Sequence, residues 1–191
     1  MRLALVLAVM LVPAVAVAGP ITAGVNLGID HSKEAAQSGT DASRTFGLFG
    51  RLGLTPRLSA QLEVSKIRSA DESTEIRSVT GLLVVDLSSS ATLVPVLLVG
   101  FGGDWSESSY GDCVVCAVDS TQSATHIEGG FGLEYRAPGG LTIGADVRMG
   151  GRSMDNHDVV IQDAPVRALY YPAGMREGEY RNARIRLGIR F

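Results

Sequence analysis

Apolar and polar residues alternate with a period of two along most of this chain. From Ile21 to Asp30, every odd position is aliphatic and every even position is polar or glycine. Such alternation indicates a β-strand with one apolar and one polar face. The pattern predicts eight strands, over residues 21–30, 44–54, 58–67, 76–87, 92–103, 125–136, 141–150 and 180–191. In the fifth strand, both faces are apolar apart from glycines, so the pattern does not show which face points inward.

The connections between these strands are alternately long and short. Tight turns are predicted at Thr55-Pro56-Arg57 and Pro138-Gly139-Gly140, and Ser88-Ser89-Ser90 marks the third short connection. Strands of about 10 residues are long enough to cross a hydrocarbon layer at a tilt of roughly 45°. An even number of strands places both termini of the barrel on the side of the short turns. The long connections are predicted at residues 31–43, 68–75, 104–124 and 151–179.

The distribution of charge indicates which face of each strand meets lipid. The apolar faces carry no charge along whole strands, whereas the opposite faces combine acids and bases with glycine and serine. An eight-stranded barrel is so narrow that side chains fill it. We therefore predict an all-β fold, an eight-stranded antiparallel transmembrane β-barrel in an up-and-down meander; the alternative is a soluble barrel with the opposite facing. The predicted charge network of the lumen comprises Arg51, Glu63, Asp86, Glu128, Glu134, Asp146, Arg148, Arg184 and Arg186.

The first 18 residues have the organisation of a signal peptide. Met1 and Arg2 precede an apolar run that ends in Ala16-Val17-Ala18, a small-x-small cleavage pattern. The run is shorter than the roughly 20 residues that a transmembrane helix needs. We expect cleavage after Ala18, with residues 19–191 forming the barrel domain; an uncleaved membrane anchor is the alternative.

Composition narrows the classes of partner and of site. The net charge of −3 provides no basic surface for nucleic acid. The two cysteines, Cys113 and Cys116, are too few for a disulfide-built scaffold, and in an oxidising compartment they favour one small loop disulfide. A zinc or redox role has less support, because a single C-x-x-C without a second Cys or His pair is a weak signal. Free thiols and intermolecular pairing also stay open for the two cysteines. We assign no metal ligands and no cofactor.

Taken together, these features resemble the OmpA/OmpX-type family of small outer-membrane β-barrels over essentially all of residues 19–191. The phrase Thr-Leu-Val-Pro-Val-Leu-Leu-Val-Gly-Phe-Gly at 92–102 resembles the family's proline-then-glycine pattern, and Arg-Ile-Arg-Leu-Gly-Ile-Arg-Phe resembles its C-terminal strand. The resemblance implies short periplasmic turns, long extracellular loops, a Gram-negative outer-membrane location among lipid, and an assembly signal at Phe191 that the barrel-assembly machinery reads. The aromatic girdle is thin, with candidates Phe46, Phe101, Trp105, Phe131, Tyr135, Tyr180 and Phe191.

This resemblance does not specify an activity, because the family includes anchors, adhesins, weak pores and a few lipid enzymes. We expect a non-enzymatic structural or surface-interaction role through the external loops, toward an extracellular protein or surface ligand. Tyr170 and Tyr171, in the apolar part of loop 151–179, are the candidate partner contacts. The same segment would instead be covered if strands seven and eight continued above the membrane as a hairpin.

A narrow passive pore and a lipid A-modifying enzyme are the two competing functions. In the pore, the interior acids and bases would part and admit water. In the enzyme, similar barrels carry His-x-Ser on one strand, but here the tripeptide is His126-Ile127-Glu128, without the serine. His31 and His157 are predicted to lie in loops. No catalytic residue is assigned.

Overall fold

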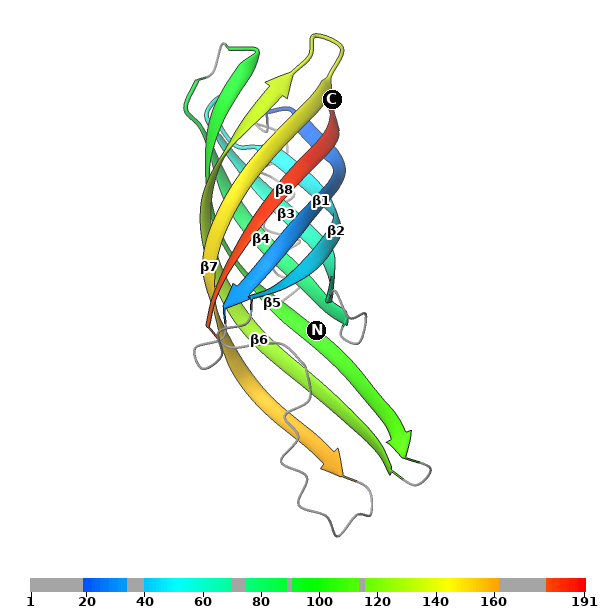
Figure 1. The fold of residues 1–191 in the computed structure, drawn as a ribbon. Coiled ribbons are helices and arrows are strands. Elements are labelled where there is room, and N and C mark those ends of the chain that lie inside the picture. Colours follow the sequence, from blue (N-terminus) through cyan, green and yellow to red (C-terminus); the bar gives the residue numbers. More distant parts are fainter. Residues whose placement is uncertain (1–18, 34–39, 70–74, 89–90, 114–115, 162–177) are drawn as a thin grey trace, which may run out of the picture.

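The computed structural model describes residues 19–33, 40–69, 75–88, 91–113, 116–161 and 178–191. Over these residues the chain forms a closed antiparallel barrel in which each strand pairs with the next and the last pairs with the first (Figure 1). The predicted eight-stranded meander is confirmed. Among the described residues, no helix is long and apolar enough to span a membrane. The strands are β1 (Ile21–Lys33), β2 (Thr40–Gly53), β3 (Leu58–Ser69), β4 (Glu75–Asp86), β5 (Leu93–Cys113), β6 (Cys116–Arg136), β7 (Leu141–Ile161) and β8 (Gly178–Arg190).

The short turns lie together at one end of the barrel, which we call the turn end; the opposite end is the loop end (Figure 1). In the β2–β3 turn, the Thr55 hydroxyl accepts a hydrogen bond of 3.0 Å from the Leu58 amide. In the β6–β7 turn, Gly140 has a φ of 86°, a conformation that glycine adopts at little cost. Its carbonyl accepts a hydrogen bond of 2.7 Å from the Arg190 amide, which ties this turn to β8.

The outer surface of the barrel is an apolar band. Large side chains such as Leu62, Phe131 and Ile185 are 56%, 65% and 63% exposed. On β1 the band runs from Ile21 to Ile29, which matches the roughly 9–11 residues of a tilted transmembrane strand. Because an apolar surface of this extent is stable only against hydrocarbon, the predicted facing, apolar outside and charged inside, is correct. One girdle candidate was placed wrongly: Tyr180 points into the lumen and is only 4% exposed.

The inward faces of β4 and β5 include an apolar stretch between their buried polar residues. On β5 the even positions point inward, and this answers the question of facing that the sequence pattern left open. These side chains pack together and fill one side of the lumen. The cluster consists of Leu82, Val84, Val94, Val96 and Leu98.

Three strands continue beyond the barrel wall, in place of two of the predicted long loops. Residues 108–113 of β5, 116–124 of β6 and 153–161 of β7 form an antiparallel sheet that projects from the loop end, and we call it the extension (Figure 1). The predicted loops 104–124 and 151–179 were therefore too long. The alternative hairpin of strands seven and eight falls on residues 162–177, outside the described part of the chain; in the described part, β7 continues past Arg152 against β6.

A glycine permits the close approach of strands where the barrel closes. Gly24 of β1 is the register partner of Gly188 of β8, and the Phe49 ring from β2 lies over both. A Cβ atom at Gly24 would lie 2.6 Å from the Cα of Gly188 and 2.8 Å from Cε1 of Phe49, and it would also collide with the carbonyl oxygen of Leu187. This position therefore excludes any larger residue unless the closing strands move apart.

Candidate functional site, the charged interior of the barrel

The interior of the barrel holds a dense set of buried charges. Because inward positions alternate with lipid-facing ones, each strand contributes its charged residues at intervals of two. Buried ions are stable only when they are paired and hydrogen-bonded. Arginines and carboxylates are both present, and the buried ones are Asp30, Arg51, Glu63, Asp86, Asp104, Glu128, Glu134, Asp146, Arg148, Arg152, Arg184 and Arg186.

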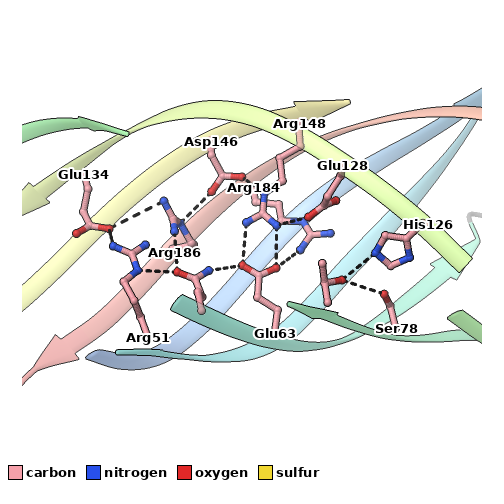
Figure 2. Close-up of polar contacts among 12 residues, drawn as sticks. Arg51, Glu63, Ser78, His126, Glu128, Glu134, Asp146, Arg148, Arg184 and Arg186 are labelled. Carbon is pink, nitrogen blue, oxygen red and sulfur yellow. Dashed lines mark hydrogen bonds and ion pairs between the residues drawn. The ribbon is translucent and has the colours of Figure 1, made fainter. Parts of the chain in front are cut away.

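Arg148 of β7 is the centre of this network (Figure 2). Its guanidinium contacts Glu63 across the lumen through two hydrogen bonds of 2.8 and 2.9 Å. It also pairs with Glu128 at 2.7 Å and with Asp146 at 2.6 Å. Arg184 forms a second ion pair with Glu63, at 2.5 Å. Because β3, β6, β7 and β8 supply these groups, the cluster connects opposite walls of the barrel.

A second cluster lies toward the turn end. Arg51 pairs with Glu134 at 2.7 Å, and its Nε donates a hydrogen bond of 2.7 Å to the side-chain oxygen of Gln61. Arg136 links Glu134, at 2.8 Å, to Asp86, at 2.7 Å. Gln61 in turn donates a hydrogen bond of 2.6 Å to Glu63, so the second cluster is joined to the central one. Gln61 and Arg136 were not among the predicted network residues.

A third cluster lies toward the loop end. Asp104 of β5 pairs with Arg152 of β7 at 2.6 Å and lies 3.1 Å from Nδ1 of His126. The other ring nitrogen of His126 lies 3.1 Å from the hydroxyl of Thr80. Tyr180 packs edge-on against His126 and donates a hydrogen bond of 3.0 Å to Glu128, which joins this cluster to the central one. Asp104 and Arg152 were missed because both were assigned to loops.

The third cluster places an acid, an imidazole and a hydroxyl in the order found in hydrolase triads. All three side chains face the lumen, however, and Thr80 and Asp104 are 2% and 1% exposed. Arg152 also occupies the carboxylate of Asp104. The cluster therefore has the features of interior packing.

The structure buries all nine predicted network residues in the lumen; the one not yet described, Arg186, lies 2.9 Å from Asp146 and 4.0 Å from Glu134. His31 and His157 belong to β1 and β7 and not to loops. Cys113 and Cys116 are register partners at the tip of the extension, but their side chains lie outside the described part of the chain, as do Tyr170 and Tyr171. Within the described residues, no group of three or more His, Cys, Asp or Glu has the arrangement of a metal site.

Comparison with known proteins identifies the family. The model of the outer membrane protein beta-barrel domain matches residues 2–175. The chain belongs to this family. Among solved structures, Neisserial surface protein A superposes with a TM-score of 0.67 and 9% identity, covering 91% of this chain and 99% of that one. The N-terminal β-barrel domain of Pseudomonas aeruginosa OprF gives a TM-score of 0.52 and 14% identity, covering 88% and 97%. No curated protein matches in sequence.

The outer-membrane β-barrel thus has an apolar exterior in lipid and a lumen divided by ion pairs. A vestibule of about 580 Å³ opens at the turn end. Its lining reaches Arg51 and Glu134 but includes neither Glu63 nor Arg148, which lie deeper. The vestibule therefore borders the second cluster.

Proposed function

We propose that this protein is a non-conducting outer-membrane barrel that displays the extension of β5, β6 and β7 at the cell surface for binding to an extracellular partner. One observation supports the proposal above the others: the interior is filled by linked ion pairs and aliphatic side chains, while three strands continue past the membrane. A barrel built for transport would be expected to keep its interior open, and a plain anchor has no need of the extra strand length.

The filled lumen supports the closed state. The three charged clusters are joined through Gln61 and Tyr180, so contacts continue along the barrel axis. The aliphatic cluster on β4 and β5 occupies the remaining wall. Opening a path for ions would require several buried arginine–carboxylate pairs to separate together, and each would leave charges without partners in a poorly hydrated interior.

The geometry of the extension supports a role in binding. Glu75, the first residue of β4, pairs with Glu107, and β8 begins opposite Arg152, so within the described residues both edges of the extension lack a neighbouring strand. Unpaired strand edges offer rows of backbone donors and acceptors that an extended peptide can join. We expect the partner to present such a segment, and Tyr170 and Tyr171, in the connection that follows β7, remain proposed contacts.

Planar bilayers containing the refolded protein are expected to show no steady channel openings, because the ion pairs around Arg148 close the lumen. The measurement is single-channel recording, after different migration of boiled and unboiled samples on a gel has confirmed a folded barrel. Steady openings whose conductance changes in Arg148→Met or Glu134→Gln would contradict the proposal and would favour a narrow passive pore.

Cysteine labelling in intact cells tests whether the extension is displayed. A membrane-impermeant maleimide, applied after mild reduction, is expected to label Cys113 and Cys116, the two cysteines of the chain. The matched control carries Cys113→Ser, Cys116→Ser and Arg57→Cys, with its thiol in the exposed β2–β3 turn, and should react only after the membrane is permeabilised. The opposite result would place the extension in the periplasm.

We also propose that the barrel-assembly machinery reads the end of β8. The Phe191 side chain is 77% exposed, and its amide donates a hydrogen bond of 2.8 Å to Ile21 on the other closing strand. Phe191→Ser should therefore lower the amount of folded barrel in cells severalfold while leaving the yield of refolding in detergent unchanged. An equal loss in both assays would indicate a purely structural role for Phe191.

A further inference from the structure

The lipid-facing wall of the barrel contains a groove where the apolar band is thin. It has a volume of about 650 Å³ and lies over β8, between β1 and β2 on one side and β6 and β7 on the other. The register explains the hollow: Ala183 lies between Val147 and Ile29, and Ala145 lies between Leu133 and Ile185. Small residues in rows of large ones leave space at the surface, and Arg44 lines the groove as its outward-facing cation.

Basic residues border the apolar band on the neighbouring strands, at the loop end. Arg44 of β2 is the direct register partner of Arg68 of β3, and Lys66 of β3 is the direct partner of Arg77 of β4. Arg68 and Arg77 have side chains that are 61% and 68% exposed. Like charges directly opposite each other destabilise a sheet unless an anion lies between them. We call this set the basic patch: Arg44, Lys66, Arg68 and Arg77.

The described residues supply little negative charge to the basic patch. Glu75 lies 2.6 Å from Lys66, 3.7 Å from Arg77 and 3.9 Å from Arg68, so one carboxylate serves three cations. The hydrogen bond from Lys66 and the nearby arginines lower the pKa of Glu75, which keeps it ionised. Arg44 forms no ion pair with any described residue. Counted over the described residues, the patch therefore has more cations than carboxylates, and a bound anion would balance the difference.

We propose that the basic patch and the groove together bind a phosphate-bearing lipid of the outer leaflet, with the phosphate against Arg44 and Arg68 and an acyl chain over Ala145 and Ala183. A lipid fits better than a soluble anion, because the cations lie at the border of the apolar band, where headgroups meet acyl chains. Arg44 belongs to both parts, so one molecule can contact them at once. The site does not depend on closure of the lumen or on a partner of the extension, whereas its assignment to the outer leaflet rests on the proposed display of the loop end at the cell surface.

Native mass spectrometry of the detergent-refolded protein tests the phosphate contact. The probes are phosphatidylglycerol and phosphatidylcholine with identical acyl chains, and we expect preferential retention of phosphatidylglycerol. Arg44→Gln with Arg68→Gln should weaken phosphatidylglycerol binding roughly 10- to 30-fold, since each cation near a membrane surface contributes appreciably to the attraction of anionic lipid. The control is Arg57→Gln, which removes one positive charge at the turn end and should change nothing; Arg68→Gln alone is the variant matched to it in charge.

A second pair of variants tests the groove. Ala183→Leu fills its floor from the lipid side and should reduce phosphatidylglycerol retention, whereas Ala60→Leu, on the outward face of β3 away from the groove, should leave it unchanged. Inorganic phosphate at the same concentration should not displace the lipid. The proposal is overturned if the double arginine variant keeps the wild-type preference, if Ala60→Leu loses as much as Ala183→Leu, or if inorganic phosphate competes equally. If the double variant does not fold, Arg68→Gln alone is judged by the same preference.

Discussion

Replacing Arg148 with methionine is expected to lower the free energy of unfolding by about 3–5 kcal/mol, the usual cost of removing one partner from a buried ion pair. Arg148 contacts Glu63, Glu128 and Asp146, and its own side chain is completely buried. Methionine fills a similar volume, so the loss arises from three carboxylates without their shared cation. Urea unfolding in detergent micelles, followed by the fluorescence of the single tryptophan, Trp105, measures this change.

The control for this experiment is Arg57→Met, which removes an arginine from the exposed β2–β3 turn. Surface substitutions of this kind usually change stability by less than about 0.5 kcal/mol. If Arg148→Met proved as stable as Arg57→Met, then packing alone would hold the interior together, and the charges would make no net contribution to the stability of the fold.

Replacing Gly24 with valine is expected to destabilise the barrel by about 3 kcal/mol, at the upper end of the usual cost of overpacking. The new side chain would collide with the backbone of Leu187 and Gly188 and with the ring of Phe49. The backbone atoms belong to the ladder between β1 and β8, so relief requires the closing strands to separate. The urea midpoint and the temperature at which the folded gel band disappears should both fall.

Gly50→Val is the matched control, since Gly50 lies on the adjacent strand but faces outward, with nothing within 4 Å of a Cβ atom built there. Its stability should equal or slightly exceed that of the wild type. Valine favours the strand conformation, whereas glycine loses more conformational entropy when the chain folds. Equal losses at Gly24 and Gly50 would show that a general effect of valine, and not the close approach at Gly188, is responsible.

Much of the fold follows from the alternation of residues, because lipid on one side and a narrow lumen on the other impose opposite chemistry on successive positions. The first strand shows this clearly: each outward residue from Ile21 to Ile29 is aliphatic. The facing of β5 could not be predicted in this way, because both of its faces are apolar. Val94, Val96 and Leu98 fill the lumen, while Leu97 and Val99 contact lipid. Only the register with β4 and β6 decides between the two faces.

Most of the charged site was predictable where the strands cross the lipid, although Gln61 and Arg136 were overlooked there, and the part beyond the lipid was missed. Asp104 and Arg152 face the lumen, but their outward neighbours, Gly103, Trp105, Gly151 and Ser153, do not continue the aliphatic alternation that would distinguish them from loop residues. Tyr180 was assigned to the girdle because it lies near a strand end. A tyrosine there is stable either at the membrane–water interface or in the lumen, provided that its hydroxyl finds a hydrogen-bond acceptor. Its partner, Glu128, lies 52 residues away in the chain, beyond the reach of local patterns.

The ladder between β1 and β8 also limits how the protein can fold. It joins Thr22 to Arg190, so the sheet cannot become a barrel until residues at both ends of the fold are present together. Closing so long a loop carries an entropic cost that no early contact offsets, which makes the final pairing slow compared with hairpin formation. Before the barrel closes, the sheet therefore exposes an open edge on β1, and a factor that covers this edge would prevent it from pairing with a neighbouring chain.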